Sequence, residues 1–410
     1  MTDLLHEVLR AARRLRRALR PTPLDESIRL GALTGGRALL KLENTQPTGS
    51  FKVRGALNVL LALPPHVRER GIVAASSGNH GAAVAYGALT LGAPALIFVP
   101  EDTSPVKVDA MRDFGADVRM YGDDCVVAER YARAYATEHG LTYISPYNDP
   151  LVIGGQGTIG VELARQIDRL DAILVAVGGG GLISGIALAV KALLPRARIV
   201  GVQAAGCAPV PRSLAAGHPV AVAHAHTIAD GIAVKRPGEL TLSIIRQLVD
   251  DVVTVDDDAI ARAIAHAVQY DHLVVEGAGA AGLAALLSGQ VTPRPGETVC
   301  VPLCGGNIDS NLLTRVLEQV AVRQGRYLLL KSTLEDRPGN LAPLLTRVAE
   351  SGANVIDIFH RRAVWLAPLD RVGIELVLEV RDEQHGQQVV QHLLDCGYHV
   401  EREGVGSWPE

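Results

Sequence analysis

Short apolar runs alternate with helical stretches from about residue 35 to residue 320. The runs are rich in Val and Ile, and most end at Gly, Ser or Pro: GIVAASS (71–77), ALIFVP (95–100), DAILVAVG (171–178), RIVGVQA (198–204) and ETVCVPLCGG (297–306). Runs without polar alternation are typical of strands buried on both faces. The stretches between them, such as NHGAAVAYGALTLG and ISGIALAVKALLP, have helical periodicity and end at Gly or Pro. This alternation predicts an α/β fold with a doubly wound parallel sheet.

The pattern changes after about residue 320. Over the last 80 or so residues, apolar alternation and helical periodicity follow one another in the order β-α-β-β-α-β. This order predicts a separate ferredoxin-like domain, with a boundary near 320–326.

The N-terminal stretch LLHEVLRAARRLRRALRPTPL is rich in arginine. Arginine-rich leaders include transit peptides, but this stretch has no serine, contains the acidic Glu7 and follows the acidic Asp3. Its apolar residues recur at helical spacing, so we interpret it as an amphipathic helix that ends before Pro21.

Composition narrows the function classes. The chain has 410 residues, 48% of them hydrophobic and 20% charged, which suits a globular protein of two or three domains. A net charge of -4 and an aromatic content of 4% give no reason to expect nucleic-acid binding. No uninterrupted apolar run approaches the roughly 20 residues of a membrane span. The five cysteines are odd in number and lack CxxC spacing, so we expect no disulfide framework or zinc site, and a reducing cytoplasm.

Four glycines, Gly178 to Gly181, follow one predicted strand and precede a predicted helix. Such a turn exposes backbone N–H groups at a helix N-terminus, where an anion is stabilised. The spacing does not match a dinucleotide-binding fingerprint, and no Gly-Lys-Ser/Thr follows as in a P-loop. We therefore predict a phosphate-binding loop, with a plain structural turn as the alternative.

Three further segments lie where predicted strands end. SSGNHG (76–81) places polar groups at a strand-to-helix turn, as either a helix cap or a cradle for a carboxylate or phosphate. PLCGGNID (302–309) brings Cys304 to a similar edge, where a plain buried cysteine is the alternative. In TGSFKVRGA (48–56), Lys52 is by itself either a solvated charge or an amine made reactive by burial.

Taken in order, the motifs resemble those of the fold-type II pyridoxal phosphate enzymes, and most of all the threonine ammonia-lyases (threonine dehydratases). The matching segments lie between Thr22 and about residue 315: ENTQPTGSFKVRGA, SSGNHG, GGQGTIGVE, VGGGGLISG, TIADGIAV and CGGNID. The tail, notably DRPGNLAPLLTRVAESGANV, resembles a single ACT-type amino-acid-sensing domain. The resemblance implies a two-lobed, tryptophan synthase β-like catalytic domain over 1–322, with a smaller lobe of about 53–152, and an ACT-type regulatory domain over 326–405.

The resemblance also implies roles for single residues. Lys52 would bind pyridoxal 5′-phosphate covalently and would be catalytic together with Ser77, while Phe51 would pack against the cofactor ring. The phosphate would be held by backbone N–H groups of Gly178, Gly179, Gly180, Gly181 and Leu182. Asn79 would bond the ring 3′-oxygen, Gly231 would line the ring and Cys304 would face the pyridine nitrogen. The substrate carboxylate would lie at Ser77, Gly78, Asn79 and His80.

Two positions depart from the family pattern. The family often has serine where Cys304 stands, and a thiol is the weaker hydrogen-bond donor. The pyridine nitrogen would then stay largely unprotonated, which suits elimination better than racemisation. Relatives with a divalent-cation site often have glutamate at the position of Gln203, so we expect no metal here.

The activity that the resemblance implies is β-elimination from L-threonine, giving 2-oxobutanoate and ammonia, and from L-serine, giving pyruvate. The freed Lys52 amine would remove the α-proton. One alternative is a serine or hydroxyaspartate racemase/dehydratase on the same scaffold. Another is a non-catalytic amino-acid sensor, which would need a damaged cofactor site.

The tail has two interpretations, a dimerisation module and an effector site. The effector site would comprise Asp336, Pro338, Gly339 and Asn340, where a predicted strand passes into a helix. The resemblance implies a branched-chain amino acid, isoleucine or valine, as the effector. It also implies a homodimer or homotetramer, with no nucleic-acid or membrane partner.

Overall fold

A computed structural model describes residues 1–361 and 370–402. They form two compact units, which divide between Asp309 and Ser310. The expected end of the tail domain at residue 405 lies outside the described residues. Within 1–361 and 370–402, no helix combines the length and apolar character needed to cross a membrane.

The first unit has two lobes, each built on a largely parallel sheet. The larger lobe has six strands in the order β1-β2-β10-β7-β8-β9, and only β1 is antiparallel to its neighbour. Its strands are β1 (Leu24–Glu26), β2 (Arg37–Lys41), β7 (Ala172–Ala176), β8 (Arg198–Ala204), β9 (Asp251–Val255) and β10 (Thr298–Pro302).

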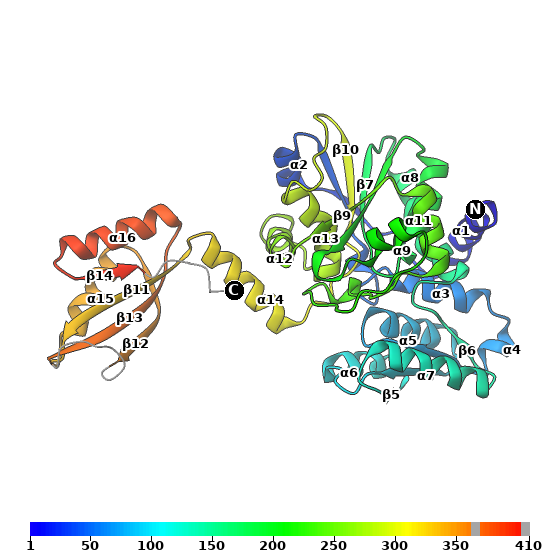
Figure 1. The fold of residues 1–410 in the computed structure, drawn as a ribbon, viewed down its shortest axis with the longest axis horizontal. Helices are drawn as coiled ribbons and strands as arrows, with labels where there is room; N and C mark the ends of the chain where they lie inside the picture. The colour runs from blue at the N-terminus through cyan, green and yellow to red at the C-terminus, as the bar shows by residue number, and fades with distance from the viewer. Residues whose placement is uncertain (362–369, 403–410) are drawn as a thin grey trace. The chain divides into compact units, whose positions relative to one another are not determined.

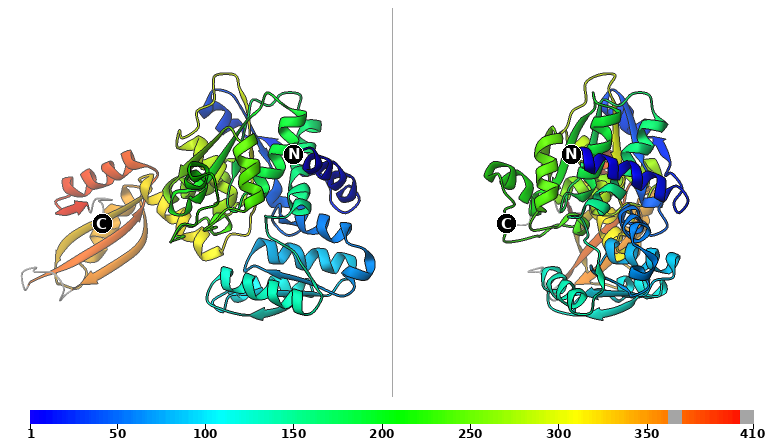
Figure 2. Two further views of the ribbon diagram at one scale, coloured as in Figure 1. Left: turned by 45° about the vertical axis from the view of Figure 1, so that its right-hand side comes forward. Right: turned by 90° about the vertical axis from the view of Figure 1, so that its right-hand side faces the viewer.

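The smaller lobe has a parallel sheet of four strands in the order β5-β4-β3-β6. Its strands are β3 (Ile72–Ala75), β4 (Ala95–Val99), β5 (Asp117–Met120) and β6 (Thr142–Tyr143). The blue-to-cyan smaller lobe stays apart from the green strands of the larger lobe in both views of Figure 2. The two-lobed α/β fold implied by the sequence is therefore confirmed, and each of the five predicted buried strands is present.

Helices cover both sheets of the first unit (Figure 1). They are α1 (Thr2–Leu15), α2 (Ile28–Thr34), α3 (Lys52–Ala62), α4 (Pro65–Arg68), α5 (Asn79–Leu91), α6 (Pro105–Asp113), α7 (Cys125–Glu138), α8 (Pro150–Gln166), α9 (Gly181–Leu193), α10 (Pro209–Ala216), α11 (Glu239–Leu248), α12 (Asp257–His266) and α13 (Gly277–Leu287). The predicted N-terminal amphipathic helix is α1, and its Val8 packs with Ile153 of α8 and Leu188 of α9.

Helix α3 joins the lobes, because it packs against α5 of the smaller lobe and α8 of the larger lobe. Its Val53, Leu57 and Leu60 belong to a buried apolar cluster that also includes Ile72 of β3 and Val152 of α8. Lys52 is the first residue of α3. The packing of the whole helix therefore holds this amine at the junction of the two lobes.

A buried network of charged side chains holds α3 in place. The Arg54 guanidinium donates two hydrogen bonds to Glu43, at 2.7 and 2.8 Å, and two to Glu162, at 2.6 and 2.9 Å. The Lys41 ammonium donates to Glu162 as well, at 2.7 Å. Two cations thus meet two carboxylates, and bidentate geometry makes each Arg–carboxylate pair strong and directional.

The second unit is an antiparallel sheet with two helices on one face. It begins with α14 (Ser310–Arg323) and continues β11 (Tyr327–Glu335), α15 (Leu341–Glu350), β12 (Asn354–Arg361), β13 (Arg371–Glu379), α16 (Glu383–Asp395) and β14 (Val400–Arg402). The strand order is β12-β13-β11-β14. This confirms the predicted βαββαβ order of a ferredoxin-like fold.

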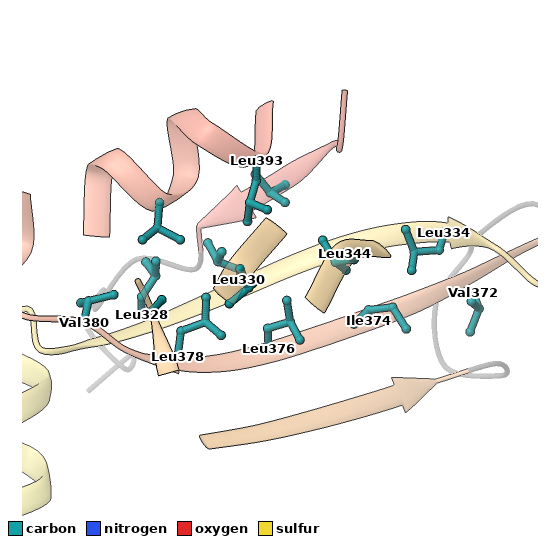
Figure 3. Close-up of a cluster of buried hydrophobic side chains, with 14 residues drawn as sticks. Leu328, Leu330, Leu334, Leu344, Val372, Ile374, Leu376, Leu378, Val380 and Leu393 are labelled. Carbon is teal, nitrogen blue, oxygen red and sulfur yellow. The ribbon is translucent and has the colours of Figure 1, made fainter. Parts of the chain in front are cut away.

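Alternate residues of the two central strands, β11 and β13, form the core of the second unit. Residues of β11 and β13 are buried at every second position, as period-two side-chain geometry requires. Figure 3 shows Leu330 and Leu376 on the same face of the sheet as Leu344 of α15 and Leu393 of α16. The fold of this unit thus follows from its apolar pattern.

Candidate active site

Among the helices of the first unit that begin without a side-chain cap, two follow a parallel strand after a short turn and have glycine as the N-cap. Helix α5 follows β3 with Gly78 as its N-cap, and α9 follows β7 with Gly180 as its N-cap. A glycine has no side chain to accept from the first N–H groups of the helix. Both helices therefore offer unpaired backbone donors and a positive dipole end for an anion.

Lys52 lies among groups from both lobes. Its Nζ donates to the carbonyl of Pro146 at 2.8 Å and lies 5.3 Å from the centre of the Phe51 ring. The preceding residue, Phe51, donates its backbone N–H to the carbonyl of Cys304 at 3.1 Å. Burial lowers the pKa of the Lys52 ammonium to about 8, although Cys304 and Glu276 act against this shift. A substantial fraction of the amine is then unprotonated near neutral pH, as nucleophilic and basic chemistry requires.

Three of the four glycines in the 178–181 loop, Gly179, Gly180 and Gly181, are packed so tightly that a side chain does not fit. A Cβ on Gly179 would lie 2.4 Å from Cγ of Tyr147, and one on Gly181 would lie 2.9 Å from Cα of the same residue. Gly180 has φ +94°, a conformation that favours glycine. The loop therefore presents backbone alone, next to the Pro146-Tyr147 segment that Lys52 contacts.

We expect the substitution Gly179→Ala to weaken binding of pyridoxal phosphate about tenfold or more, because displacing one or two backbone donors costs about 1 kcal/mol each. Fluorescence titration of the cofactor-free protein measures this change. Gly386→Ala is the matched control, because its Cβ would meet nothing closer than 3.7 Å. An unchanged cofactor affinity in Gly179→Ala would contradict a phosphate-binding role for this loop.

Asn79, the first residue of α5, is held by two side chains. Its Nδ2 donates to Oε1 of Glu276 at 2.7 Å, and its Oδ1 accepts from Nδ2 of Asn307 at 2.7 Å. Burial and the nearby charge of Asp230 raise the pKa of the Glu276 carboxyl to about 7. An amide with one N–H still available thus lies beside a buried carboxyl group.

The predicted carboxylate-binding residues differ in which of their groups remain available to bind an anion. The His80 ring is buried and its Nε2 lies 3.0 Å from the carbonyl of Ile144. Burial and the charge of Lys52 lower the pKa of His80 to about 3, so the ring is neutral at physiological pH. Only the backbone of His80 is left for an anion. Ser77 lies at the same turn, with its Oγ 3.6 Å from Sγ of Cys125.

Cys304 is buried at the end of β10, and its Sγ donates to the carbonyl of Ala278 at 3.4 Å. Burial raises the pKa of this thiol well above its ordinary value, so the thiol stays neutral. Gly231 lies close to the same group of residues, since a Cβ there would be 3.3 Å from Oε1 of Glu276. The predicted ring-facing residues are thus brought together with Asn79.

Gln203 uses both ends of its amide within the protein. Its Nε2 donates to the carbonyl of Val177 at 3.0 Å, and its Oε1 accepts from the backbone N–H of Val210 at 2.9 Å. The side chain is fully buried and neutral. In the described part of the chain, no three His, Cys, Asp or Glu side chains gather as metal ligands. The amide ties the residue before the glycine loop to α10 without a cation.

We expect removal of divalent cations to leave the catalytic rate unchanged, because the neutral Gln203 amide is bonded at both ends to the backbone of Val177 and Val210. The measurement is steady-state turnover before and after dialysis against EDTA. A loss of rate that Mg²⁺ or Ca²⁺ restores would contradict this expectation.

The arrangement fits pyridoxal 5′-phosphate part by part. The glycine loop and the start of α9 offer backbone donors where close packing against Tyr147 and Thr241 leaves no room for side chains, as a phosphate site requires. Lys52 offers an amine of lowered pKa for a covalent bond. Phe51 lies beside the Lys52 amine, and the Cys304 thiol is close enough to influence the Lys52 pKa. Gly231 and Asn79 both lie beside Glu276, and Asn79 has a second N–H.

Sequence reasoning did not assign roles to several residues that form this site. Glu276 precedes a run of small residues, GAGAAG, and gave no pattern typical of a catalytic carboxylate. Asn307 lies within the CGGNID segment, in which only Cys304 was predicted to have a role. Pro146 and Tyr147 contribute a carbonyl and a ring face, which no motif predicts. Only the three-dimensional contacts connect them to Lys52 and the glycine loop.

The predicted effector residues lie at the start of α15 in the second unit. Gly339 has φ +94°, and Nδ2 of Asn340 donates to the carbonyl of Glu335 at 3.2 Å. The backbone N–H of Asp336 donates to the carbonyl of Asp370 at 2.9 Å, while Pro338 lies in the same turn. A surface cavity adjoins this turn, lined by Gly339, Ala342, Pro343, Thr346 and Arg347.

Comparison with known proteins gives one consistent result. A family model described as "Pyridoxal-phosphate dependent enzyme" matches residues 15–305. An L-threonine ammonia-lyase of Geobacter sulfurreducens is 45% identical over 95% of this chain and 96% of its own. Threonine deaminase isoform 2 of Solanum lycopersicum has a TM-score of 0.74 at 34% identity, over 78% of this chain and 90% of that one. Maize serine racemase has a TM-score of 0.73 at 34% identity, over 78% and 98%.

Proposed function

Because the chain belongs to the pyridoxal-phosphate dependent enzyme family, we propose that it is an L-threonine ammonia-lyase that also accepts L-serine. The observation that carries the proposal is the placement of Lys52 between an uncapped phosphate cradle and an uncapped helix that begins at Asn79. The 45% identity to a full-length L-threonine ammonia-lyase supports the choice of substrate.

The cofactor of this family is pyridoxal 5′-phosphate, and Lys52, Asn79 and the 178–181 loop are the residues that would hold it. When bound, it supplies a conjugated ring that takes up the electron pair left on the substrate when the α-proton departs. Everything else in the reaction concerns binding, orientation and proton movement by the protein.

The Lys52 amine is the base that we assign to the α-proton. Burial lowers its pKa to about 8, so that the neutral amine is accessible near physiological pH. The Pro146 carbonyl, which accepts from Nζ at 2.8 Å, gives the amine a fixed direction at the lobe junction. Because the same amine also bonds to the cofactor, one side chain serves for attachment and for proton transfer.

The N-terminus of α5 binds the substrate carboxylate in this proposal. Its first N–H groups have no side-chain cap, and the dipole of a 13-residue helix favours a negative charge there. The Ser77 hydroxyl adds one more donor at the same turn. A carboxylate fixed at this point leaves the α-carbon directed towards Lys52.

The overall reaction balances without an outside oxidant or reductant. The α-proton leaves to Lys52, the β-hydroxyl leaves with its bonding electrons and a proton as water, and an enamine remains. Release of the enamine and its hydrolysis by water give 2-oxobutanoate and ammonia from threonine, or pyruvate and ammonia from serine. A non-catalytic sensor does not fit this site, because Lys52, Asn79 and the four glycines are all in place.

The similarity to maize serine racemase favours one second candidate, a racemase on the same scaffold. Racemisation requires the α-carbon to regain a proton. In elimination, the β-substituent leaves before the α-carbon can be reprotonated. The neutral Cys304 thiol, which donates to Ala278 rather than into the site, favours elimination because it leaves the electron-accepting ring less strongly activated.

The test is incubation of the purified holoenzyme with L-threonine and, separately, with L-serine. Keto acids and ammonia are measured together with the enantiomers of the remaining amino acid. The proposal predicts equal amounts of 2-oxobutanoate and ammonia from L-threonine. Abundant D-serine with little pyruvate, and no 2-oxobutanoate, would overturn it in favour of the racemase.

We also propose that the second unit is an ACT-type domain that binds a branched-chain amino acid beside Gly339 and joins subunits into a homodimer or homotetramer. Its βαββαβ order and the cavity next to the Gly339 turn support this proposal. A thermal-shift measurement on the full chain with isoleucine, valine and alanine tests it. Stabilisation by isoleucine or valine but not alanine is expected, and no shift with any amino acid would overturn the effector site.

A further inference from the structure

Both ends of the Asn79 side-chain amide are held by other side chains. Glu276, at the start of α13, accepts from Nδ2 at 2.7 Å, and Asn307, after β10, donates to Oδ1 at 2.7 Å. Helix α5 belongs to the smaller lobe, whereas Glu276 and Asn307 belong to the larger lobe. The contact therefore spans the lobe junction at the same place as Lys52.

A backbone carbonyl determines which atoms donate and which accept in this series of side-chain hydrogen bonds. The Asn307 Nδ2 donates to the carbonyl of Thr48 at 2.8 Å. A carbonyl only accepts, so this end of the Asn307 amide must be its NH₂ group. Its second N–H then reaches Oδ1 of Asn79, and the NH₂ of Asn79 is forced to the opposite side, towards Glu276.

Glu276 is the acceptor at the other end of this series of hydrogen bonds. The carboxyl group is buried, and the backbone N–H of Asn307 bonds to it as well. Two glycines make room for it, since a Cβ on Gly305 would lie 2.1 Å from Oε1 and one on Gly231 would lie 3.3 Å away. Whether ionised or protonated, the group keeps an oxygen that accepts from Asn79.

We propose that Asn307 and Glu276 are positioning residues that lock the Asn79 amide in one orientation, with its second N–H directed at the ring oxygen of the cofactor. This inference rests on the proposed function of the site as a pyridoxal phosphate enzyme. An amide rotated by 180° would present its oxygen to the cofactor's oxygen, so that an attraction would become a repulsion. Locking the amide in advance removes that state and the entropy of choosing between the two.

The substitution Asn307→Asp tests the lock with almost no change of shape. It replaces the NH₂ group by an oxygen, which then faces the carbonyl of Thr48 and Oδ1 of Asn79. Asn307→Ala removes both donors without adding a charge and serves as the second variant if Asn307→Asp folds poorly. Each variant is made in the natural chain and in an Asn79→Ala background, which gives two double-mutant cycles.

The readouts are the dissociation constant for pyridoxal phosphate and the pH midpoint of the bound cofactor's visible absorbance. Asn307→Asp and Asn79→Ala are each expected to weaken cofactor binding roughly tenfold, the size of one misdirected hydrogen bond. Both are also expected to move the absorbance midpoint in the same direction. Once Asn79 is alanine, changing Asn307 is expected to add less than about twofold, because it acts through Asn79.

Additive effects in both cycles, or an unchanged absorbance midpoint in every Asn307 variant, would overturn the positioning role. The unmodified protein is assayed alongside with L-threonine. If it forms 2-oxobutanoate while the cycles are additive, the positioning inference fails and the proposed function stands. If it binds the cofactor and the cycles are non-additive but no 2-oxobutanoate forms, the proposed reaction fails and the positioning inference stands.

Discussion

The substitution Lys52→Ala is expected to reduce ammonia release from L-threonine at least about 10³-fold, the size of a lost general base, and to remove the visible absorbance of the bound cofactor. Both losses follow from one amine, because Lys52 is the lysine that lies beside Phe51 and donates to Pro146, whose neighbour Tyr147 packs against the glycine loop. Steady-state keto acid formation and the absorbance spectrum of the purified variant measure them.

Lys191→Ala is the matched control for this change. Lys191 lies in the last turn of α9, at the end remote from the glycine loop, and pairs with Asp250 at 2.7 Å. Its removal is expected to leave both readouts within about twofold of the natural protein, since a partly exposed pair contributes little. A Lys52→Ala protein that keeps its colour and its rate would mean that the amine lies elsewhere.

The second large effect concerns stability. Arg54→Met is expected to lower the free energy of unfolding by about 3–5 kcal/mol, because it leaves the buried Glu43 carboxylate without its charged partner and Glu162 paired with Lys41 alone. Glu43 is fully buried, and Arg54 together with other donors holds the pKa of its carboxyl below the ordinary value even though burial alone would raise it. Denaturant unfolding of the cofactor-free protein, followed by circular dichroism, gives the difference.

The loss should also change with pH. The Glu43 pKa is lower in the folded state than in the unfolded state, so this pair stabilises the natural protein above the unfolded pKa. That contribution disappears as the pH falls through the folded value. The difference in unfolding free energy between the natural protein and Arg54→Met is therefore expected to shrink in acid.

Arg112→Ala, which removes an exposed pair with Asp109, is expected to change stability by less than about 1 kcal/mol. Equal effects of the two substitutions would contradict the account of the buried network.

The fold was predictable where apolar residues are continuous or regularly spaced. The runs 171–178 and 198–204 became β7 and β8, because strands covered on both faces have no polar positions. Other strands gave weaker signals. Strand β5 (Asp117–Met120) has one buried residue, and β6 (Thr142–Tyr143) has two residues, so neither produces a pattern that stands out from a loop.

Parts of the site were predictable where the backbone conformation restricts which amino acids the local sequence can contain. Consecutive glycines are typical of a turn where side chains do not fit, and the close approach of Tyr147 to Gly179 and Gly181 explains two of the four. The carboxyl group of Glu276 left no such mark, because its role depends on a contact 197 positions away in sequence with Asn79. The burial of charged residues such as Arg54 was not predictable either, since pairing across the fold does not show in local sequence.

The most direct test of the account is to locate the cofactor's covalent bond. The holoenzyme is treated with borohydride, which fixes an amine-linked cofactor permanently, and is then digested and analysed by mass spectrometry. The account predicts one modified peptide, containing TGSFKVRGA, with the cofactor's mass on Lys52. Modification of Lys41, Lys107 or another lysine in place of Lys52, or no modified peptide from a coloured protein, would contradict it.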